Sequence, residues 1–501
     1  MSQNTTIKPQ HRIPAPIAVM FASLLTFSPL SAQLIPIRTV PVASGDQFLT
    51  VPSETLGMAG TTIAVDDSVA DLWSNPAKGV FIDEPVIIGA PTFFGVSDEG
   101  GGGKTFPFTG LLRDGDWFGG ASVALQQLSG SERGRFGPFF DGFWPGPFNR
   151  LSERSARNLY GRAAIGRKLA ESDWSVGLAV FRAGLNMMTG VDQLYAGADR
   201  IDQQGAVTDL RVGVFRDGER DRVGFTLIHN RVSMEHEVHY ADIVARDTIT
   251  WEPTFEFREE LNEDRTRTLG GHLEWDRKLG AEGWSIGATL TANRKSHPKI
   301  PNYEIQNIPR DPGTTWAYEM GFGIGRHRKS TSFGIDVAYQ PIWSHTWQEA
   351  DSRMETPRGV LEIGDMTIEN HFTFSNVVLR SGISQRYDRF GFQLGLEARS
   401  YAYHLEQDDH VEATSRDQDE AWTEWTPSFG VQFRTSDFEL HSSTRITSGT
   451  GFPGIDDFFV QEDMAAAAPS SPDFIAAPRG ALTLQDVTVL THQIWIRVPI
   501  R

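Results

Sequence analysis

The sequence predicts an all-β protein, a transmembrane antiparallel β-barrel of about fourteen strands, with sixteen as the alternative count. Two observations lead to this prediction. Stretches of about ten residues alternate strictly between apolar and polar side chains, as strands with one apolar face do. Short turns also alternate with long polar connections along the chain, which is the layout of outer-membrane barrels.

The clearest alternation lies in four stretches: 284–292, 316–325, 332–340 and 390–399. Strands of a soluble β-sandwich are usually about 5–6 residues long, whereas a tilted strand needs about 9–11 residues to cross a bilayer. The polar faces of these stretches are rich in glycine and small hydroxyl residues, which suits a wet lumen. Tryptophans near strand ends suit a membrane interface. A large soluble β protein is the alternative interpretation.

Connection lengths give an independent signal. Short turns are predicted at 169–173, 217–221, 279–283, 327–331, 388–389 and 435–437. Long polar segments are predicted at 129–157, 184–206, 232–265, 295–315, 342–370, 403–423 and 447–483. The least clear strands are 86–94 and 105–112. At the other end of the chain, Ile494, Ile496, Val498 and Ile500 alternate as a closing strand should, although many such barrels end in an aromatic residue and this chain ends in Arg501.

Composition excludes several classes of protein. The 501 residues include no cysteine, so disulfides, a Cys-ligated zinc site and a Cys nucleophile are excluded. Asp plus Glu number 64 against 46 Lys plus Arg, a net charge of −18. Without a basic surplus to neutralise phosphates, nucleic acid is not an expected partner.

The first 32 residues resemble a signal peptide. Basic residues precede the apolar stretch 17–30, which is too short to span a bilayer comfortably, and a cleavage site precedes Gln33. An N-terminal membrane anchor is the alternative. An exported chain without a spanning helix is either soluble outside the cytoplasm or crosses a membrane as strands. The strand pattern favours the second option and predicts the outer membrane of a Gram-negative-type bacterium, in contact with outer-membrane lipid.

Residues 56–79 are unlike the predicted strands. A short helix is expected over 66–73, with Asp66 or Asp67 as its N-cap, and Asn75-Pro76 should end it. The stretch resembles the opening segment of the long-chain fatty-acid transporter (FadL) family of outer-membrane barrels, which has a G-x-A-G run, an acidic pair and an N-P-A motif. The residues that carry the resemblance are Gly57, Ala59, Gly60, Asp66, Asp67, Asn75, Pro76 and Ala77.

This resemblance implies a 14-stranded barrel over residues 85–501, with long extracellular loops and a hatch segment, 33–84, folded into the lumen. It implies binding and passage of hydrophobic, fatty-acid-like molecules without covalent chemistry and without a cofactor. The same superfamily includes PorV-like barrels of type IX secretion, so protein secretion or surface attachment is the alternative function, with secretion-system proteins as partners. In either case the barrel-assembly machinery is an expected partner.

One predicted loop, 136–148, is unusually aromatic for a segment exposed to water. It is predicted to capture the hydrophobic ligand. The alternative is a loop that packs its own aromatic rings or rests on the outer leaflet. The residues concerned are Phe136, Phe139, Phe140, Phe143 and Trp144.

Strand parity places six charged side chains in the lumen. They form either a structural ion-pair network or a site where an arginine receives a substrate carboxylate. The six are Arg162, Arg211, Glu319, Asp336, Glu397 and Arg399.

No catalytic or metal motif is complete. Gly100–Gly103 before Lys104 and Thr105 is not a phosphate-binding loop, because Asp98 stands where its first glycine is required. His236 and His239 are one residue short of the H-E-x-x-H spacing and, on a strand, would point to opposite faces. No G-x-S-x-G sequence occurs. The sequence therefore predicts neither an enzyme nor a metal site; an outer-membrane lipase is the remaining enzymatic alternative.

Overall fold

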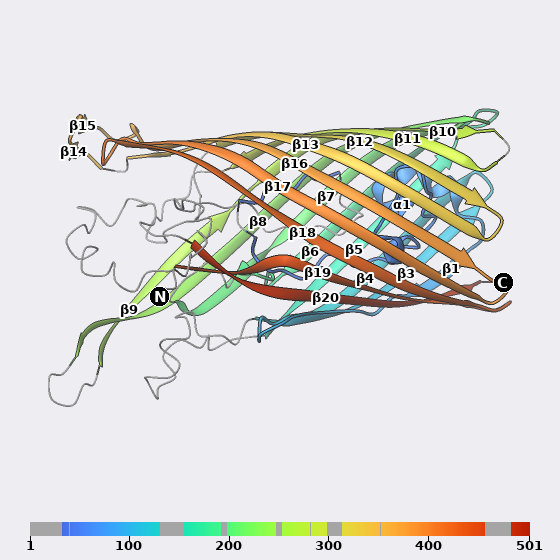
Figure 1. Cartoon of the computed structure of the whole chain (residues 1–501), viewed down its shortest axis with the longest axis horizontal. Coiled ribbons are helices and arrows are strands. Elements are labelled where there is room, and N and C mark those ends of the chain that lie inside the picture. Colours follow the sequence, from blue (N-terminus) through green and yellow to red (C-terminus); the bar gives the residue numbers. More distant parts are fainter. Residues whose placement is uncertain are drawn as a thin grey trace, which may run out of the picture.

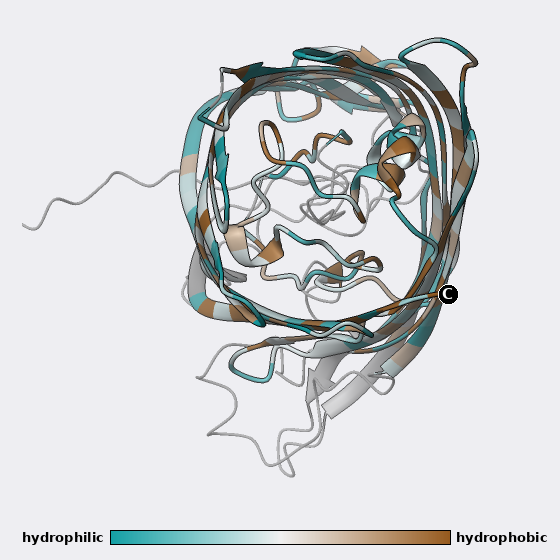
Figure 2. Cartoon of the chain, turned by 90° about the vertical axis from the view of Figure 1, so that its right-hand side faces the viewer, coloured by the Kyte–Doolittle hydropathy of each residue, from teal (hydrophilic) through white to brown (hydrophobic). Residues whose placement is uncertain are grey.

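The computed structural model describes residues 33–39, 41–130, 155–191, 198–246, 253–280, 282–297, 313–350, 352–455 and 482–500. Strands dominate this part of the chain and wrap into a long barrel, with segments of the chain inside it (Figures 1 and 2). No helix in these ranges is long and apolar enough to cross a membrane. The predicted signal peptide lies outside the described residues.

The strands follow one another in chain order around the barrel, except β14 and β15, which pair with each other in a separate two-stranded sheet. The first ten are β1 (Val86–Gly89), β2 (Thr92–Val96), β3 (Gly102–Asp114), β4 (Trp117–Ser129), β5 (Ser155–Lys168), β6 (Trp174–Leu185), β7 (Ala198–Asp217), β8 (Asp221–Arg246), β9 (Pro253–Asp264) and β10 (Arg267–Leu279). The others are β11 (Trp284–His297), β12 (Gly313–Arg328), β13 (Thr331–Glu349), β14 (Met354–Thr356), β15 (Gly359–Leu361), β16 (Met366–Arg386), β17 (Phe390–Asp409), β18 (Thr414–Arg434), β19 (Glu439–Ile455) and β20 (Leu482–Pro499).

Antiparallel pairing closes the sheet into a barrel. The last strand, β20, pairs with both β1 and β2, which pair in turn with β3. The described sheet has 18 strands, but β1 and β2 share one position in the wall, and β9 and β10 both pair with β8 in series, so the barrel has 16 positions. The predicted range of fourteen to sixteen therefore resolves to sixteen, because the two least clear segments, 86–94 and 105–112, both form wall strands.

The short turns lie at one end of the barrel as predicted, but two of the long loops predicted at the other end are largely strands. Tight connections such as 169–173 and 387–389 lie at the end where the chain also finishes (Figure 1). At the opposite end, 232–265 and 403–423 were expected to be loops, but β8 pairs with β9 and β17 with β18 through most of these ranges. The outward residues of β8 and β17 there are polar, among them Glu235, Glu237 and Glu406, so the apolar outer face that reveals a membrane strand is absent, and the wall extends further than predicted.

The wall is apolar outside and polar inside, which confirms the predicted parity. Phe322, Val337 and Leu394 are exposed on the outside, by 55%, 44% and 57%. Their strand neighbours on the other face, such as Asp336 and Gln393, are buried in the lumen. An apolar outer band around a polar interior is the distribution that a barrel in lipid requires.

Residues 33–84, hereafter the luminal segment, lie inside the barrel in the part that the structure describes (Figure 2). Its regular structure is limited to the 3₁₀ turn η2 (Leu56–Met58), the helix α1 (Asp71–Ser74) and the 3₁₀ helix η3 (Pro76–Phe81). The helix expected over 66–73 begins later, at Asp71, and is only four residues long; the Asp67 side chain accepts from Ala70 N–H in the turn before it. Asn75-Pro76 ends α1 as expected, with Asn75 in an extended conformation.

The apolar outer face of the wall leads to a prediction about stability. Replacing Phe322 by Arg puts a charge opposite lipid near the middle of the wall, and we expect a loss of about 2–4 kcal/mol in unfolding free energy, measured by urea titration of the protein in bilayers. The control is Asp417→Arg, at an exposed outward position far along β18 from its short turn, which should change stability by less than about 1 kcal/mol. Equal losses at both positions would contradict the lipid-facing assignment.

Candidate functional site in the lumen

Wall side chains hold the backbone of the luminal segment. The Asp336 carboxylate on β13 accepts hydrogen bonds from the backbone N–H groups of Thr62 at 2.7 Å and Ile63 at 3.2 Å. On β18, the Ser428 hydroxyl accepts from Ala59 N–H at 2.9 Å and donates to the Gly57 carbonyl at 3.1 Å. A segment with so little helix or strand has few internal partners for its peptide groups, so the wall supplies them.

Gly57 and Gly60 belong to this contact for steric reasons. A Cβ atom on Gly57 would lie 2.5 Å from Gln393 Oε1 and 2.9 Å from the Cα of Gly430, both on the wall. Gly60 has φ of 70°, in the left-handed region that favours glycine. A side chain on Gly57 would therefore push the turn away from the wall, and one on Gly60 would be strained by the backbone conformation.

The wall side of the contact is also rich in glycine. A Cβ on Gly325 would lie 2.4 Å from the Ala64 carbonyl oxygen, and one on Gly177 2.4 Å from the Pro76 carbonyl. Gly382 and Gly395 approach residues 58 and 59 just as closely. The glycine-rich polar face seen in the sequence is thus the surface on which the backbone of the luminal segment packs.

The two acidic residues of the motif have separate partners. Asp66 forms a two-pronged ion pair with Arg222 of β8, at 2.8 and 3.1 Å, and Arg222 also binds Asp276 of β10. Asp67 is fully buried and accepts hydrogen bonds from Ser53 Oγ at 2.6 Å and from the N–H groups of Glu54 at 2.8 Å and Ala70 at 2.9 Å. Asp66 therefore ties the segment to the wall, and Asp67 ties its two halves together.

The N-P-A motif begins η3 and contacts the wall through Glu274 of β10. The Asn75 side chain accepts from Ala77 N–H at 3.1 Å and donates to Glu274 at 2.9 Å. Pro76 takes the first position of η3, where its missing N–H costs nothing. Lys78 pairs with the same Glu274 at 2.6 Å.

Residues 38–43 sit at a seam in the wall. β18 pairs with β17 along its whole length, but its pairing with β19 ends at Trp425 and Ser448. Beyond that point β19 pairs instead with the luminal segment, through Ala43 N–H to Gly451 O and Gly451 N–H to Pro41 O, both 2.8 Å. Arg38 binds Glu424 of β18 at 2.8 Å, so the luminal segment occupies the place between the two strands.

A buried apolar area interrupts the polar lumen on the side of β5 to β8. We call it the apolar luminal patch, and its members on the wall include Tyr160, Phe181, Ala183, Leu185, Val207, Val232, Met234 and Val238. Val42 and Phe48 of the luminal segment cover it. The Gln47 side chain holds this cover in place by donating to Met187 O at 3.0 Å and accepting from Thr189 N–H at 2.9 Å.

Arg162 of β5 lies at the edge of this patch. Its guanidinium stacks on the Phe181 ring at 4.3 Å, and its Nε is buried without a hydrogen-bond acceptor. No carboxylate of the described residues lies within ion-pair distance of it. Arg211 on β7 differs, since it binds Asp209 at 2.7 Å and Gln33 at 2.9 Å. Both arginines line a cavity of about 30 Å³ beside Phe48.

The other predicted lumen charges all lie inside, but far from the patch. Glu319 accepts a hydrogen bond from Gln340 at 2.6 Å. Glu397 is surrounded by Arg380, Arg399 at 3.5 Å and Arg445 at 3.7 Å, and Arg445 reaches Asp46 of the luminal segment at 3.4 Å. Glu397 and its three arginines form an ion-pair network, whereas Glu319 has Gln340 as its partner and Arg162 lies outside the network.

A second cavity, of about 130 Å³, lies at the short-turn end of the lumen. Glu54 and Asp66 of the luminal segment line one side, and Arg386, Tyr387 and Arg389 near the β16–β17 turn line the other. The luminal segment therefore borders a cavity at each of two levels.

Two sequence predictions have different outcomes. The aromatic loop with Phe136, Phe139, Phe140, Phe143 and Trp144 lies outside the described residues. His236 is buried in the lumen while His239 approaches Asp202 at 3.5 Å, on the other side of β8, as the three-residue spacing predicted.

The apolar luminal patch was not predicted from the sequence. Its members lie on strand faces that are otherwise polar. In β8 the sequence pattern that indicates the patch is Val232, Met234 and Val238, spaced by two and four residues in a segment that was expected to be a loop. A search for apolar residues on the lumen parity of β5 to β8 would have found it.

No known protein family and no curated protein matches the sequence. Solved structures that are similar include a Pseudomonas aeruginosa FadL homologue, at 10% identity and a TM-score of 0.45, covering 92% of this chain and 100% of the other. They also include the P. putida toluene transporter TodX, at 11% identity and a TM-score of 0.37, covering 89% of this chain and 98% of the other. A third is the E. coli K12 ferric-catecholate import receptor Fiu, at 7% identity and a TM-score of 0.37, covering 82% of this chain and 82% of the other.

The strand pairing itself defines the class. A closed antiparallel wall of sixteen positions, apolar outside and polar inside, is the architecture of outer-membrane β-barrel proteins. The chain is an outer-membrane barrel with its luminal segment bound to the inner wall.

The attachment of the luminal segment should depend on pH. Burial raises the pKa of the Asp71 carboxyl to about 7 from an ordinary value of 3.8, and the Lys78 ammonium opposes this rise. Because the folded protein holds this proton more tightly than the unfolded chain does, the stability it contributes is present below about pH 4 and declines as pH rises through 7. Hydrogen exchange of residues 71–81, corrected for intrinsic rates, should lose protection between about pH 4 and 7.

The matched variant is Asp71→Asn, which should flatten this profile. Asp173→Asn, in an exposed turn, should leave it unchanged. A profile equally steep in the Asp71 variant would show that another group is responsible.

Proposed function

We propose that this barrel binds hydrophobic small molecules that carry an acidic head group, fatty-acid-like in chemistry, and passes them across the outer membrane. The observation that carries the proposal is Arg162, a cation without a carboxylate partner among the described residues, placed at the edge of the apolar luminal patch. The apolar part of a ligand would lie on the patch, and its carboxylate would bind the arginine.

The energetics favour such a ligand. Apolar surface that leaves water for the patch gains roughly 25 cal/mol per Å². A carboxylate bound to Arg162 would add a charge-assisted hydrogen bond and would supply the acceptor that its buried Nε lacks. Arg211 is less suited to this role because Asp209 already neutralises it.

The luminal segment has to move for the ligand to bind. The cavity beside Arg162 has room for about one water molecule, and Val42 and Phe48 cover the patch. In this proposal the segment is the hatch: ligand and residues 42–48 compete for the same wall. Release of residues 38–43 would also uncover the seam between β18 and β19.

Two further parts of the proposal rest on the sequence. The aromatic loop 136–148 would collect the ligand outside, and residues 1–32 would direct export. The resemblance of residues 57–77 to the fatty-acid transporter family supports the same substrate class.

The head-group test is Arg162→Gln. We expect binding of a long-chain fatty acid to weaken by about 10- to 100-fold, as loss of a charge-assisted hydrogen bond of roughly 1.5–3 kcal/mol implies. The measurement is calorimetric titration of the purified barrel in detergent with oleate.

Two controls make this test specific. Methyl oleate, which has no charge, should bind equally well to the unchanged protein and to the Arg162→Gln variant. Arg182→Gln changes an arginine on the outer face of β6 and should leave oleate binding unchanged. If Arg162→Gln weakened ester and acid equally, the arginine would act through packing, and the head-group assignment would be wrong.

The hatch test uses the absence of cysteine in the chain. Val42 and Gly451 are bridge partners on neighbouring backbones, about 4.8 Å apart, which is within the range a disulfide spans. We expect Val42→Cys with Gly451→Cys, once oxidised, to lock residues 42–48 over the patch and to abolish oleate uptake into proteoliposomes. Reduction should restore it.

Each single cysteine variant should transport normally under both conditions. Undiminished uptake by the oxidised double variant, with the cross-link confirmed by mass spectrometry, would refute a hatch that moves at this point.

A further inference from the structure

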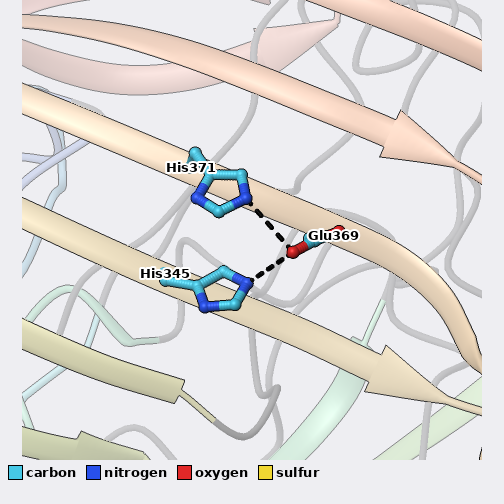
Figure 3. Close-up of side chains that lie close together, drawn as sticks. All are labelled: His345, Glu369 and His371. Atoms are coloured by element: carbon cyan, nitrogen blue, oxygen red, sulfur yellow. Dashed lines mark hydrogen bonds and ion pairs between the residues drawn. The ribbon is translucent and has the colours of Figure 1, made fainter.

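Two histidines and a glutamate meet on the outside of the wall, away from the lumen. His345 Nε2 lies 2.8 Å and His371 Nε2 3.1 Å from the same oxygen, Oε1 of Glu369 (Figure 3). The two imidazole rings are stacked, with centroids 4.3 Å apart and planes 5° from parallel. We propose that these three side chains bind a divalent transition-metal ion of the zinc class.

Strand register creates the cluster. His345 on β13 is the direct partner of His371 on β16, and Glu369 is two residues before His371 on the same face. Directly paired residues on antiparallel strands hold their Cβ atoms about 4.5–5.5 Å apart, so the two imidazoles are fixed on adjacent strands of a rigid sheet. The backbone has therefore positioned the ligands before any ion arrives.

The geometry is close to what a metal needs. Bonds of about 2.0–2.1 Å to nitrogen and oxygen in a tetrahedral site place ligand atoms roughly 3.3 Å apart. The nitrogen–oxygen distances of 2.8 and 3.1 Å have to open by only a few tenths of an ångström. All three ligand atoms lie within 4.8 Å of one another. An ion held here would keep at least one coordination position for water, because the described residues supply three ligands.

The surroundings favour a cation. On β17 the strand partners of His371 and Glu369 are Glu406 and Asp408, both exposed on the same outer face. The site lies just beyond Trp343, which is 50% exposed next to Trp316 on the outer wall and suits the membrane interface. The cluster therefore faces the water on the side of the barrel opposite its short turns, where external ions have access.

The donor set indicates which ion. Two imidazoles and one carboxylate suit zinc and neighbouring first-row ions, whereas calcium and magnesium prefer oxygen ligands alone. A second cluster, Asp202, Glu237 and His239, has only one imidazole, and Arg200 already pairs with Asp202 at 2.8 Å. The cluster of His345, Glu369 and His371 is for that reason the site we assign.

The experiment is titration of the full-length, detergent-purified barrel with zinc chloride after treatment with a chelator. We expect saturable binding at this site in isothermal titration calorimetry. His371→Ala and Glu369→Gln should each weaken it by more than the ~10- to 100-fold that changes around a metal site typically cost. Cobalt(II) absorption in the visible region should show imidazole coordination that both variants lose.

The matched control is His229→Ala, an exposed histidine on β8 outside both clusters, which should bind zinc as the unchanged protein does. Heat-dependent electrophoretic mobility verifies that each variant has formed its barrel. If the unchanged protein failed to bind zinc, or if His371→Ala and Glu369→Gln both bound it undiminished, Glu369 would be only a hydrogen-bond acceptor for two histidines and the metal site would be refuted.

Discussion

The structure depends on how an almost irregular segment of some fifty residues satisfies its backbone inside a barrel. Buried peptide groups need hydrogen-bond partners, and α1 and the two 3₁₀ elements supply few. Buried carboxylates and hydroxyls supply the rest: Asp336 and Ser428 from the wall, and Asp67 from within the segment. Wall glycines such as Gly325 allow the backbone to approach closely enough for these bonds.

The need for backbone hydrogen-bond partners connects the luminal segment to the proposed site. The same residues that cover the apolar luminal patch, Val42 and Phe48, lie beside the pairing with β19 at Gly451 and the anchor formed by Gln47. In the proposed function, a ligand on the patch would act on hydrogen bonds between segment and wall, and not on a separate lid. Interactions that are individually worth about 1 kcal/mol suit the holding and release that this proposal requires.

The polar lumen serves two different purposes. Around Glu397 the arginines are matched by carboxylates, which stabilises charge away from water. At Arg162 the wall provides an aromatic face but no carboxylate within ion-pair distance among the described residues, since Asp209, which lines the same cavity, pairs with Arg211. Parity in the sequence placed all six charges inside but could not separate these cases, because ion pairing depends on which strands are neighbours and on where the luminal segment lies.

The sequence by itself determined the class of fold, the short-turn end, the two faces of strands such as 316–325 and 390–399, and the stop at Asn75-Pro76. These follow from local periodicity and backbone chemistry. The tertiary structure decided the sixteenth position of the wall, the strand extensions in 232–265 and 403–423, the apolar patch, and the meeting of His345 with His371. Each depends on register between strands, which brings together residues far apart in the chain.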